Sequence, residues 1–208
     1  MDLASAGRAT VKMATEPQRP TGDARNAKEV EDAALVARAR SGDREAFGVL
    51  VDRYADQARR VARAVLQDPD DADDAAQDAF LAALVKLEQY DSARPFGPWL
   101  MRIVANAATD RRRRRKVRSA VSLNEGLVAG GARPDVVAER EVLLGRLRVA
   151  LAELPERRRL AVTLFDVEGY SHAEIAQVLG IPEGTVRSEV FHARRKLRVL
   201  LADWRDDG

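Results

Sequence analysis

Residues 170–198 constrain the fold of this chain most, because two helices and the turn between them can be read from single residues. Ser171 precedes Glu174 by three positions, which is the spacing of a capping box at a helix start. Gly180 follows an apolar stripe at helical spacing, and a glycine there can end a helix in the left-handed conformation. Pro182 favours an extended step before a second helix opens. The segment therefore predicts a helix-turn-helix motif.

The second helix of this motif has one apolar face and one polar face. The inward residues recur at helical spacing and are Val186, Val190, Ala193 and Leu197. A helix in the major groove reads base edges and phosphates with its outward side chains, which predicts a DNA-binding face. That face comprises Thr185, Arg187, Ser188, Phe191, His192, Arg194, Arg195, Lys196 and Arg198. The alternative is a solvated amphipathic helix of a bundle, with Phe191 in the core.

Composition favours an intracellular regulator over a secreted or membrane protein. The 208 residues include 35 Lys and Arg against 33 Asp and Glu, so the net charge of +2 hides strong local segregation. The chain has no cysteine, which excludes disulfides and thiolate metal sites. The sequence has no apolar run that could span a bilayer or act as a signal peptide, so we expect a cytoplasmic protein.

The pattern predicts an all-α fold of two small helical domains joined by a flexible linker. Residues 1–28 are small and polar without an apolar period, which predicts a disordered tail. Residues 29–118 form the first helical domain, with a third helix from about Asp71 to Gln89 and a fourth from about Pro98. Residues 119–135 mix glycine, serine and proline and predict the linker. Residues 136–208 form the helix-turn-helix domain, and no strand pattern is found.

An acidic stretch, DPDDADDAAQD at 68–78, suggests a metal site at first sight. A calcium loop needs oxygen ligands at alternate positions and a glycine turn, and Ala72 without a following glycine breaks that pattern. Part of the charge is explained by the preference for acidic residues at a helix start. The remaining carboxylates favour a basic protein partner.

A basic stretch, RRRRRKVR at 111–118, carries the opposite charge and continues an apolar helix. Its natural counterpart is nucleic-acid phosphate, although such runs can also be solubilising tails. Phe96, Trp99 and Asn106 lie just upstream, where rings could stack on unpaired bases and an amide could bond an everted base. Core packing is the other role open to Phe96, and the favoured one for Trp99.

Three blocks of the sequence, in this order, carry a family resemblance. They are ALVARARSGDREAF continuing to DAAQDAFLAAL, then FGPWLMRIVANAATDRRRR, then LPERRRLAVTLF continuing to FHARRKL. Together they are similar to the extracytoplasmic-function (ECF) sigma factors of bacteria. The resemblance implies two helical domains, regions 2 and 4, which bind the β and β′ subunits of core RNA polymerase. It also implies recognition of the −35 and −10 promoter elements, and thereby the direction of transcription initiation.

The resemblance assigns roles to particular residues. Polymerase binding falls to Asp71, Asp73, Asp74, Gln77, Asp78, Phe80 and Leu81. Recognition and melting of the −10 element fall to Arg94, Phe96, Trp99, Asn106, Asp110, Arg111, Arg112, Arg113 and Arg114. The family is also commonly controlled by anti-sigma factors, and it acts by binding, without a cofactor, a metal or catalytic residues. Two departures are Leu84, where the family often has tryptophan, and Glu189, where a basic residue is common.

Two alternatives remain beside the sigma-factor interpretation. A free-standing helix-turn-helix regulator would explain the second domain but leave the acidic and aromatic-basic helices of the first without a role. A metal-dependent nuclease could use clustered aspartates with basic helices. The two histidines, His172 and His192, lie far from the aspartates in the sequence, and no ligand set is evident.

Overall fold

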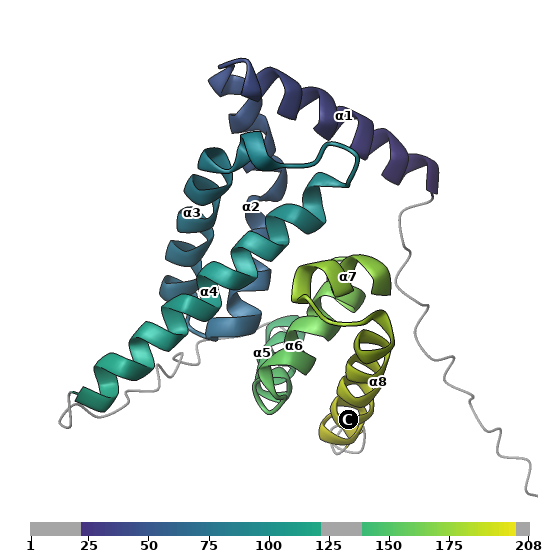
Figure 1. Cartoon of the computed structure of the whole chain (residues 1–208). Helices are drawn as coiled ribbons and strands as arrows, with labels where there is room; N and C mark the ends of the chain where they lie inside the picture. The colour runs from purple at the N-terminus through teal and green to yellow at the C-terminus, as the bar shows by residue number, and fades with distance from the viewer. Residues whose placement is uncertain (1–21, 122–138, 203–208) are drawn as a thin grey trace, which may run out of the picture.

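A computed structural model describes residues 22–121 and 139–202, which are mostly helical and contain no strand (Figure 1). The predicted all-α fold is confirmed. The first half comprises α1 (Gly22–Arg40), α2 (Arg44–Leu66), α3 (Pro69–Val85), the 3-10 turn η1 (Leu87–Gln89) and α4 (Phe96–Val121). The second half comprises α5 (Glu139–Ala152), α6 (Glu156–Val162), the π-helical turn η2 (Thr163–Val167), α7 (His172–Leu179) and α8 (Glu183–Leu200).

Side-chain caps fix where the central helices begin. Asp43 accepts a hydrogen bond from the Ala46 backbone N–H at the start of α2, over 3.0 Å. Asp68 accepts from the Asp71 N–H, over 3.1 Å, and Pro69 occupies the first helical position of α3. This aspartate cap explains why α3 begins before the expected Asp71.

Three element boundaries differ from the sequence-based predictions. Helix α1 begins at Gly22, inside the stretch 1–28 that was expected to be disordered, because a helix end needs good helix formers but no apolar period. Helix α3 ends at Val85, and the remaining residues to Gln89 form the separate turn η1. Helix α4 continues past Arg118 to Val121, so the start of the expected linker is helical. Residues 1–21 and most of the expected linker lie outside the described residues.

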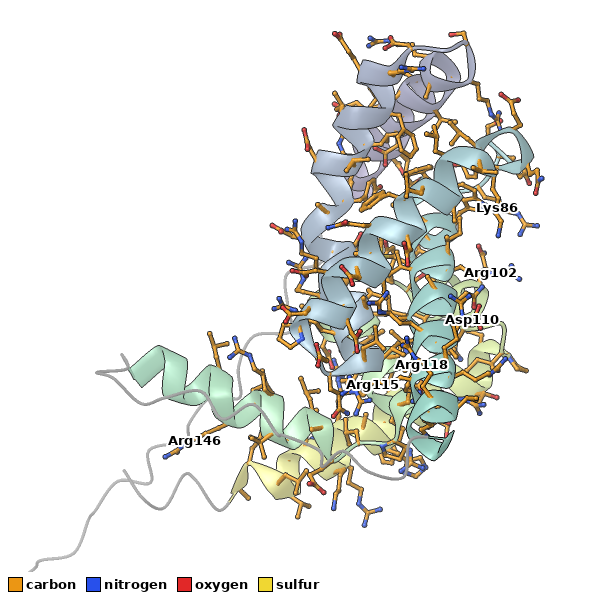
Figure 2. The ribbon with its side chains drawn as sticks, turned by 90° about the vertical axis from the view of Figure 1, so that its left-hand side faces the viewer. Lys86, Arg102, Asp110, Arg115, Arg118 and Arg146 are labelled. Atoms are coloured by element: carbon orange, nitrogen blue, oxygen red, sulfur yellow. The ribbon has the colours of Figure 1, made fainter. Side chains whose placement is uncertain are left out.

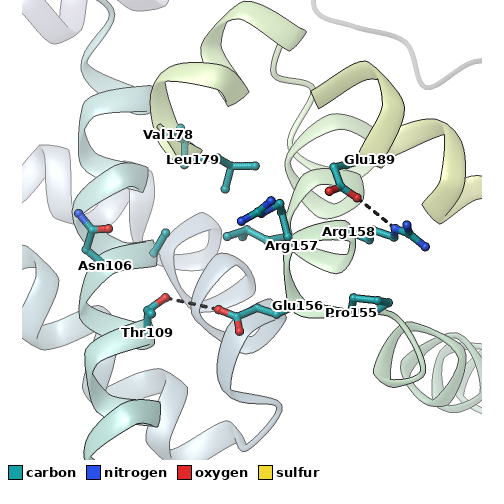
Figure 3. A pocket seen from close by; sticks show the side chains of 11 residues that line it. Asn106, Thr109, Pro155, Glu156, Arg157, Arg158, Val178, Leu179 and Glu189 are labelled. Carbon is teal, nitrogen blue, oxygen red and sulfur yellow. Dashed lines mark hydrogen bonds and ion pairs between the residues drawn. The ribbon is translucent and has the colours of Figure 1, made fainter. Parts of the chain in front are cut away.

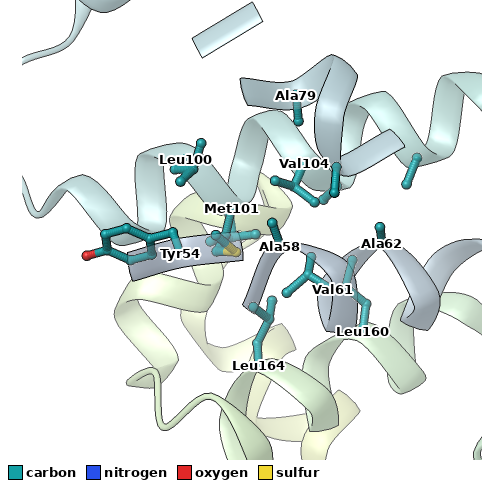
Figure 4. Close-up of a cluster of buried hydrophobic side chains, with 14 of the residues drawn as sticks. Tyr54, Ala58, Val61, Ala62, Ala79, Leu100, Met101, Val104, Leu160 and Leu164 are labelled. Atoms are coloured by element: carbon teal, nitrogen blue, oxygen red, sulfur yellow. The ribbon is translucent and has the colours of Figure 1, made fainter. Parts of the chain in front are cut away.

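Helix α2 lies at the centre of the molecule, packed between α1, α3 and α4 of its own half and α6 of the second half. Its buried face includes Ala58 and Val61, which meet Met101 of α4 and Leu164 of the second half in one hydrophobic core (Figure 4). The face that α3 buries consists only of alanines, namely Ala72, Ala75, Ala76, Ala79 and Ala83. Small side chains let α3 approach α2 and α4 closely.

The two halves meet along a continuous contact, here called the domain interface. It is formed by α6, η2 and α7 on one side and by α2 and α4 on the other. In Figure 1, α7 lies beside α4 and α6 lies below it, so the helix-turn-helix stands against the side of the first half. The interface contains a site for hydrogen bonds as well as the apolar core, and it determines which faces of α4 and α8 are open.

Candidate DNA and polymerase interfaces

The helix-turn-helix forms as the sequence predicts. The Ser171 hydroxyl accepts from the Glu174 N–H over 3.3 Å, and the Glu174 carboxylate accepts from the Ser171 N–H over 2.8 Å, which confirms the capping box. Gly180 has φ of 64°, in the left-handed region where glycine is favoured. Helix α8 then opens directly after Pro182. Local sequence signals therefore suffice to place the recognition helix.

The outward face of α8 carries polar side chains around one large apolar ring. Val186, Val190 and Ala193 are buried as predicted. Phe191 is 62% exposed and lies edge-on to His192, with ring centroids 5.5 Å apart. A solvent-facing phenyl ring has no packing role in this half, and it is suited to contact thymine methyl groups in a major groove.

Several charged residues of α8 are bound within the protein. Arg194, expected to contact phosphate, pairs with Asp166 and lies over the Phe165 ring at 5.0 Å from its centroid. Arg187 pairs with Glu183 one turn earlier, at 2.5 Å, and remains exposed. Glu189 does not face outward but accepts from Arg158 of α6, with Nε and Oε2 3.0 Å apart.

Glu189 therefore has a role that its sequence did not reveal. Its side chain is only 18% exposed and helps to hold α8 on α6. Neither a base-reading nor a phosphate-repelling role is compatible with that position. The paired Arg158 lies 31 positions away in the sequence, and no local signal could have announced it.

The acidic and basic stretches of the first half pair with each other. Arg111 of α4 contacts Asp71 at 2.9 Å and Asp74 at 2.6 Å. Hydrogen bonding by Arg111, and then by Arg115, lowers the pKa of Asp71 below its usual value. The sequence analysis expected each stretch to meet an external partner, whereas part of each charge is satisfied internally.

The outer face of α3 still presents a strip of mixed chemistry to solvent, here called the α3 strip. Its exposed members are Asp74, Gln77, Asp78, Leu81, Leu84 and Val85. Leu81 is 65% exposed and Val85 is 81% exposed. Adjacent apolar and acidic side chains on one helix face are typical of a protein-binding surface. Among the other residues expected to bind polymerase, Asp71, Asp73 and Phe80 are partly buried.

Phe96 and Trp99 have different surroundings. Phe96 is 2% exposed and packs edge-on against Tyr54 and Tyr90, with centroids 5.6 Å away in both cases. This burial corrects the expectation that Phe96 stacks on bases. Trp99 is only partly buried and lines an open hollow of about 250 Å³. Trp99 is thus the ring that an unpaired base could reach.

The hollow combines aromatic and basic groups beside the loop that precedes α4. Its lining includes Tyr90, Arg94, Trp99, Arg102 and, from α7, Gln177. The Tyr90 hydroxyl donates to the Arg94 carbonyl, and burial raises the pKa of Tyr90 to about 12, so this donor persists at neutral pH. The sequence analysis missed Arg102, although its position three residues after Trp99 and four before Asn106 places all three on one helix face.

The domain interface contains a buried carboxylate at its centre. The Glu168 side chain is 3% exposed and accepts from Arg60 of α2 over 2.6 Å and from Gln57 over 3.0 Å. Glu168 also raises the pKa of Arg60 by accepting this hydrogen bond. The Tyr170 hydroxyl donates to the Gln57 amide oxygen over 3.0 Å. These bonds join residues of the two halves with defined geometry.

Arg159 is a second polar centre of the interface, and it is buried without a carboxylate partner in the described part of the chain. Its guanidinium donates to the carbonyl oxygens of Ala64, near the end of α2, and of Leu154, after α5, the latter over 3.1 Å. Burial lowers the pKa of Arg159, as does the neighbouring charge of Arg112. One cation therefore joins three helices through backbone dipoles.

A cavity of about 630 Å³ opens beside the interface, between α4, α6 and α8 (Figure 3). Asn106 and Thr109 line it from α4, and Thr109 donates to Glu156 over 3.5 Å. Glu156 also pairs with Arg112. Asn106 is exposed at its rim, as a base-contacting amide needs to be.

Within residues 22–121 and 139–202, the helices are too short or too polar to cross a membrane. The same residues contain no group of three or more His, Asp or Glu side chains placed to hold a metal ion. The clustered aspartates of α3 are instead occupied by arginines. This arrangement gives a metal-dependent nuclease no support.

Comparison with known proteins agrees with this geometry. Residues 50–118 match the family described as Sigma-70 region 2, and residues 144–197 match Sigma-70, region 4. ECF RNA polymerase sigma factor SigM of Mycobacterium tuberculosis is 39% identical over 173 residues, covering 83% of this chain and 86% of SigM.

Two solved structures are also similar. CnrH, in complex with the cytosolic domain of CnrY, has 33% identity and a TM-score of 0.64, covering 83% of this chain and 98% of CnrH. RpoE of Bartonella quintana, in complex with the anti-sigma factor NepR, has 25% identity and a TM-score of 0.61, covering 75% and 96% of the two chains. The chain belongs to the extracytoplasmic-function family of RNA polymerase sigma factors.

Proposed function

We propose that the two halves divide the work of a sigma factor at the residues identified above. Residues 29–118 bind core RNA polymerase and open the downstream promoter element, and residues 136–208 read the upstream element. The protein acts by binding and positioning, without covalent chemistry, in the cytoplasm where RNA polymerase works. The observation that carries the proposal is the α3 strip, which exposes carboxylates beside apolar side chains.

The α3 strip fits a basic, partly apolar surface of core polymerase. Asp78 is 66% exposed and only 3.8 Å from Arg111, so most of its charge is available to a partner. Leu81 follows within one turn and offers apolar area that would otherwise remain in water. Charge complementarity steers the encounter, and apolar burial then stabilises the complex.

Promoter DNA is proposed to contact the molecule at two places. The outward face of α8, with Ser188, Phe191 and Arg195 exposed, is suited to a major groove. The hollow beside Trp99, with Arg94 and Arg102 at its edge, is suited to an unpaired base and its phosphates. A base that leaves the duplex stacks on a ring more readily than a paired one.

A free-standing helix-turn-helix regulator would also use α8. That alternative leaves the α3 strip and the Trp99 hollow without a partner, so the sigma-factor function accounts for more of the exposed chemistry. We also propose an anti-sigma factor as a partner, because the RpoE relative was solved with one. The cavity beside Asn106 and Glu156 is open to such a protein.

Run-off transcription with purified core polymerase on a library of promoter fragments tests the main function. We expect transcripts only when both the chain and core are present. In parallel, Asp78→Lys/Leu81→Glu should weaken binding to core by on the order of tenfold or more, since attraction becomes repulsion. Asp52→Lys changes an equally exposed carboxylate on α2 and serves as the control. Equal affinity of both variants for core would refute the role of the α3 strip.

A further inference from the structure

The arginines at 111–115 of α4 cannot all face one partner, because each residue of an α-helix is rotated by about 100° from the last. We propose that Arg111 and Arg115 are positioning residues that hold α3 in place for polymerase, and that Arg113 and Arg114 meet promoter phosphates. This division rests on the proposed function of α3 as the polymerase-binding helix. It removes Arg111 from the set expected to contact DNA.

Arg111 is surrounded by three carboxylates of α3. Its Nε lies 2.9 Å from Asp71 Oδ1 and its Nη2 lies 2.6 Å from Asp74 Oδ2, while Asp78 is at 3.8 Å. These hydrogen bonds raise the pKa of the Arg111 guanidinium, with Asp71 as the main cause. The planar fork of a guanidinium fixes direction as well as charge, so the contact orients α3 about its own axis.

Arg115 lies one turn further along the same face of α4. Its Nη1 contacts Asp71 Oδ2 at 2.8 Å and Asp68 Oδ2 at 3.4 Å. Asp71 therefore accepts from both arginines, and Asp68 is also the residue that caps α3. In Figure 2, Arg115 lies on the side of α4 toward α3, whereas Arg102 and Asp110 project from the other side.

The remaining arginines of the run have other surroundings. Arg112 faces the second half and pairs with Glu156 of α6. Arg113 and Arg114 are exposed and form no ion pair with the described residues. Helical rotation places Arg113 close to the face that carries Trp99 and Asn106. A phosphate bound beside those residues would therefore reach Arg113 before Arg111.

The acidic composition of α3 explains why such positioning is needed. The carboxylates of its first turns repel one another, and its buried face offers only alanine side chains, which remove little apolar area from water. Apolar packing alone leaves the rotation of α3 weakly defined. The two arginines neutralise part of the repulsion and select one rotation, which sets where Asp78 and Leu81 point.

Two double variants that remove the same charge from the same helix provide the test. They are Arg111→Gln/Arg115→Gln and Arg113→Gln/Arg114→Gln. Both are titrated against core polymerase, and the holoenzymes are then titrated with fork-junction promoter DNA over a range of salt. We expect the first to bind core about five- to tenfold more weakly with an unchanged salt slope for DNA. The second should keep its core affinity and lose about 0.7–0.9 of slope per phosphate contact.

Arg111→Lys separates positioning from charge. A lysine can serve a phosphate as a point charge, but it cannot present two parallel donors to Asp71 and Asp74. We therefore expect Arg111→Lys to lose core affinity and to speed amide hydrogen exchange in α3, as the glutamine variants do. Hydrogen exchange needs neither polymerase nor DNA, so it reports on α3 directly.

Two results would overturn the assignment. One is a lower DNA salt slope for Arg111→Gln/Arg115→Gln with unchanged core affinity and unchanged exchange in α3. The other is full recovery of core affinity and α3 protection in Arg111→Lys. A wild-type chain that fails to bind core would instead overturn the proposed function, while exchange in α3 would still decide whether the arginines hold that helix.

Discussion

Gly97→Ala is expected to separate the two halves of the molecule without unfolding either of them. Gly97 lies in the first turn of α4, and a Cβ built there would stand 2.7 Å from the hydroxyl oxygen of Tyr170. Tyr170 is buried at the domain interface and is held by its hydrogen bond to Gln57. The tyrosine cannot retreat without breaking that bond, so the added methyl group must displace the second half.

The size of the effect follows from these contacts. Adding a methyl group to a packed site costs roughly 1–3 kcal/mol, and the lost Tyr170 hydrogen bond adds about 1 kcal/mol. Within the first half, Tyr54 atoms lie at 3.2 and 3.3 Å, a crowding that a shift of a few tenths of an ångström relieves. A docking equilibrium weakened by roughly 1–3 kcal/mol changes about 5- to 150-fold.

Distance measurements between spin labels can detect this opening. The chain has no cysteine, so Glu45→Cys on α2 and Lys196→Cys on α8 provide two unique labelling sites, one in each half. We expect a single narrow distance in the parent chain and a broad, longer distribution in Gly97→Ala. Tyr170→Phe removes the nearest atom, so adding it to Gly97→Ala should restore much of the short distance. An unchanged distribution in a folded Gly97→Ala chain would refute the reasoning.

Three further predictions concern single sites. Phe96→Ala should lower the free energy of unfolding by about 3–5 kcal/mol, measured by urea denaturation, whereas Trp99→Ala should spare stability and reduce permanganate reactivity of melted promoter thymines. Glu189→Ala should cost about 1 kcal/mol or less through loss of the Arg158 pair, and a selection from randomised upstream elements should return an unchanged consensus. The pKa of Asp71 is lowered by Arg111, so its contribution to stability is complete above its unperturbed value of 3.8 and is lost as pH falls through the lower folded value. Thermal melts of Asp71→Asn should lack this acid-dependent loss.

Local signals predicted the helix-turn-helix better than any other part of the fold. The capping box at Ser171, the left-handed Gly180 and the buried stripe at Val186 each act within one or two helical turns, and all three were confirmed. The exposed ring of Phe191 followed from the same periodicity. Where a short stretch of chain determines its own conformation, its sequence is sufficient.

Contacts between distant helices could not be predicted in this way. Arg111 and Asp71 are 40 positions apart, so each charge was assigned an external partner when it had an internal one. Phe96 looked available to DNA because the three aromatic rings around it come from separate segments. Glu189 was expected on the outer face because nothing in α8 itself indicates Arg158. Helical rotation alone could have separated Arg111 from Arg113, but only the position of α3 shows which of them is satisfied.

The buried Arg159 has a consequence for how readily the two halves part. Its charge is held by uncharged carbonyl groups, so dissolved ions that weaken the Arg60 and Glu168 pair should have little effect on it. Separation would also return this cation to water, and the hydration regained offsets part of the apolar contact given up. An apolar side chain at this position would gain nothing from water on separation. The buried cation therefore keeps the association of the halves weaker than their contact area implies, and close enough to balance for a binding partner to reverse it.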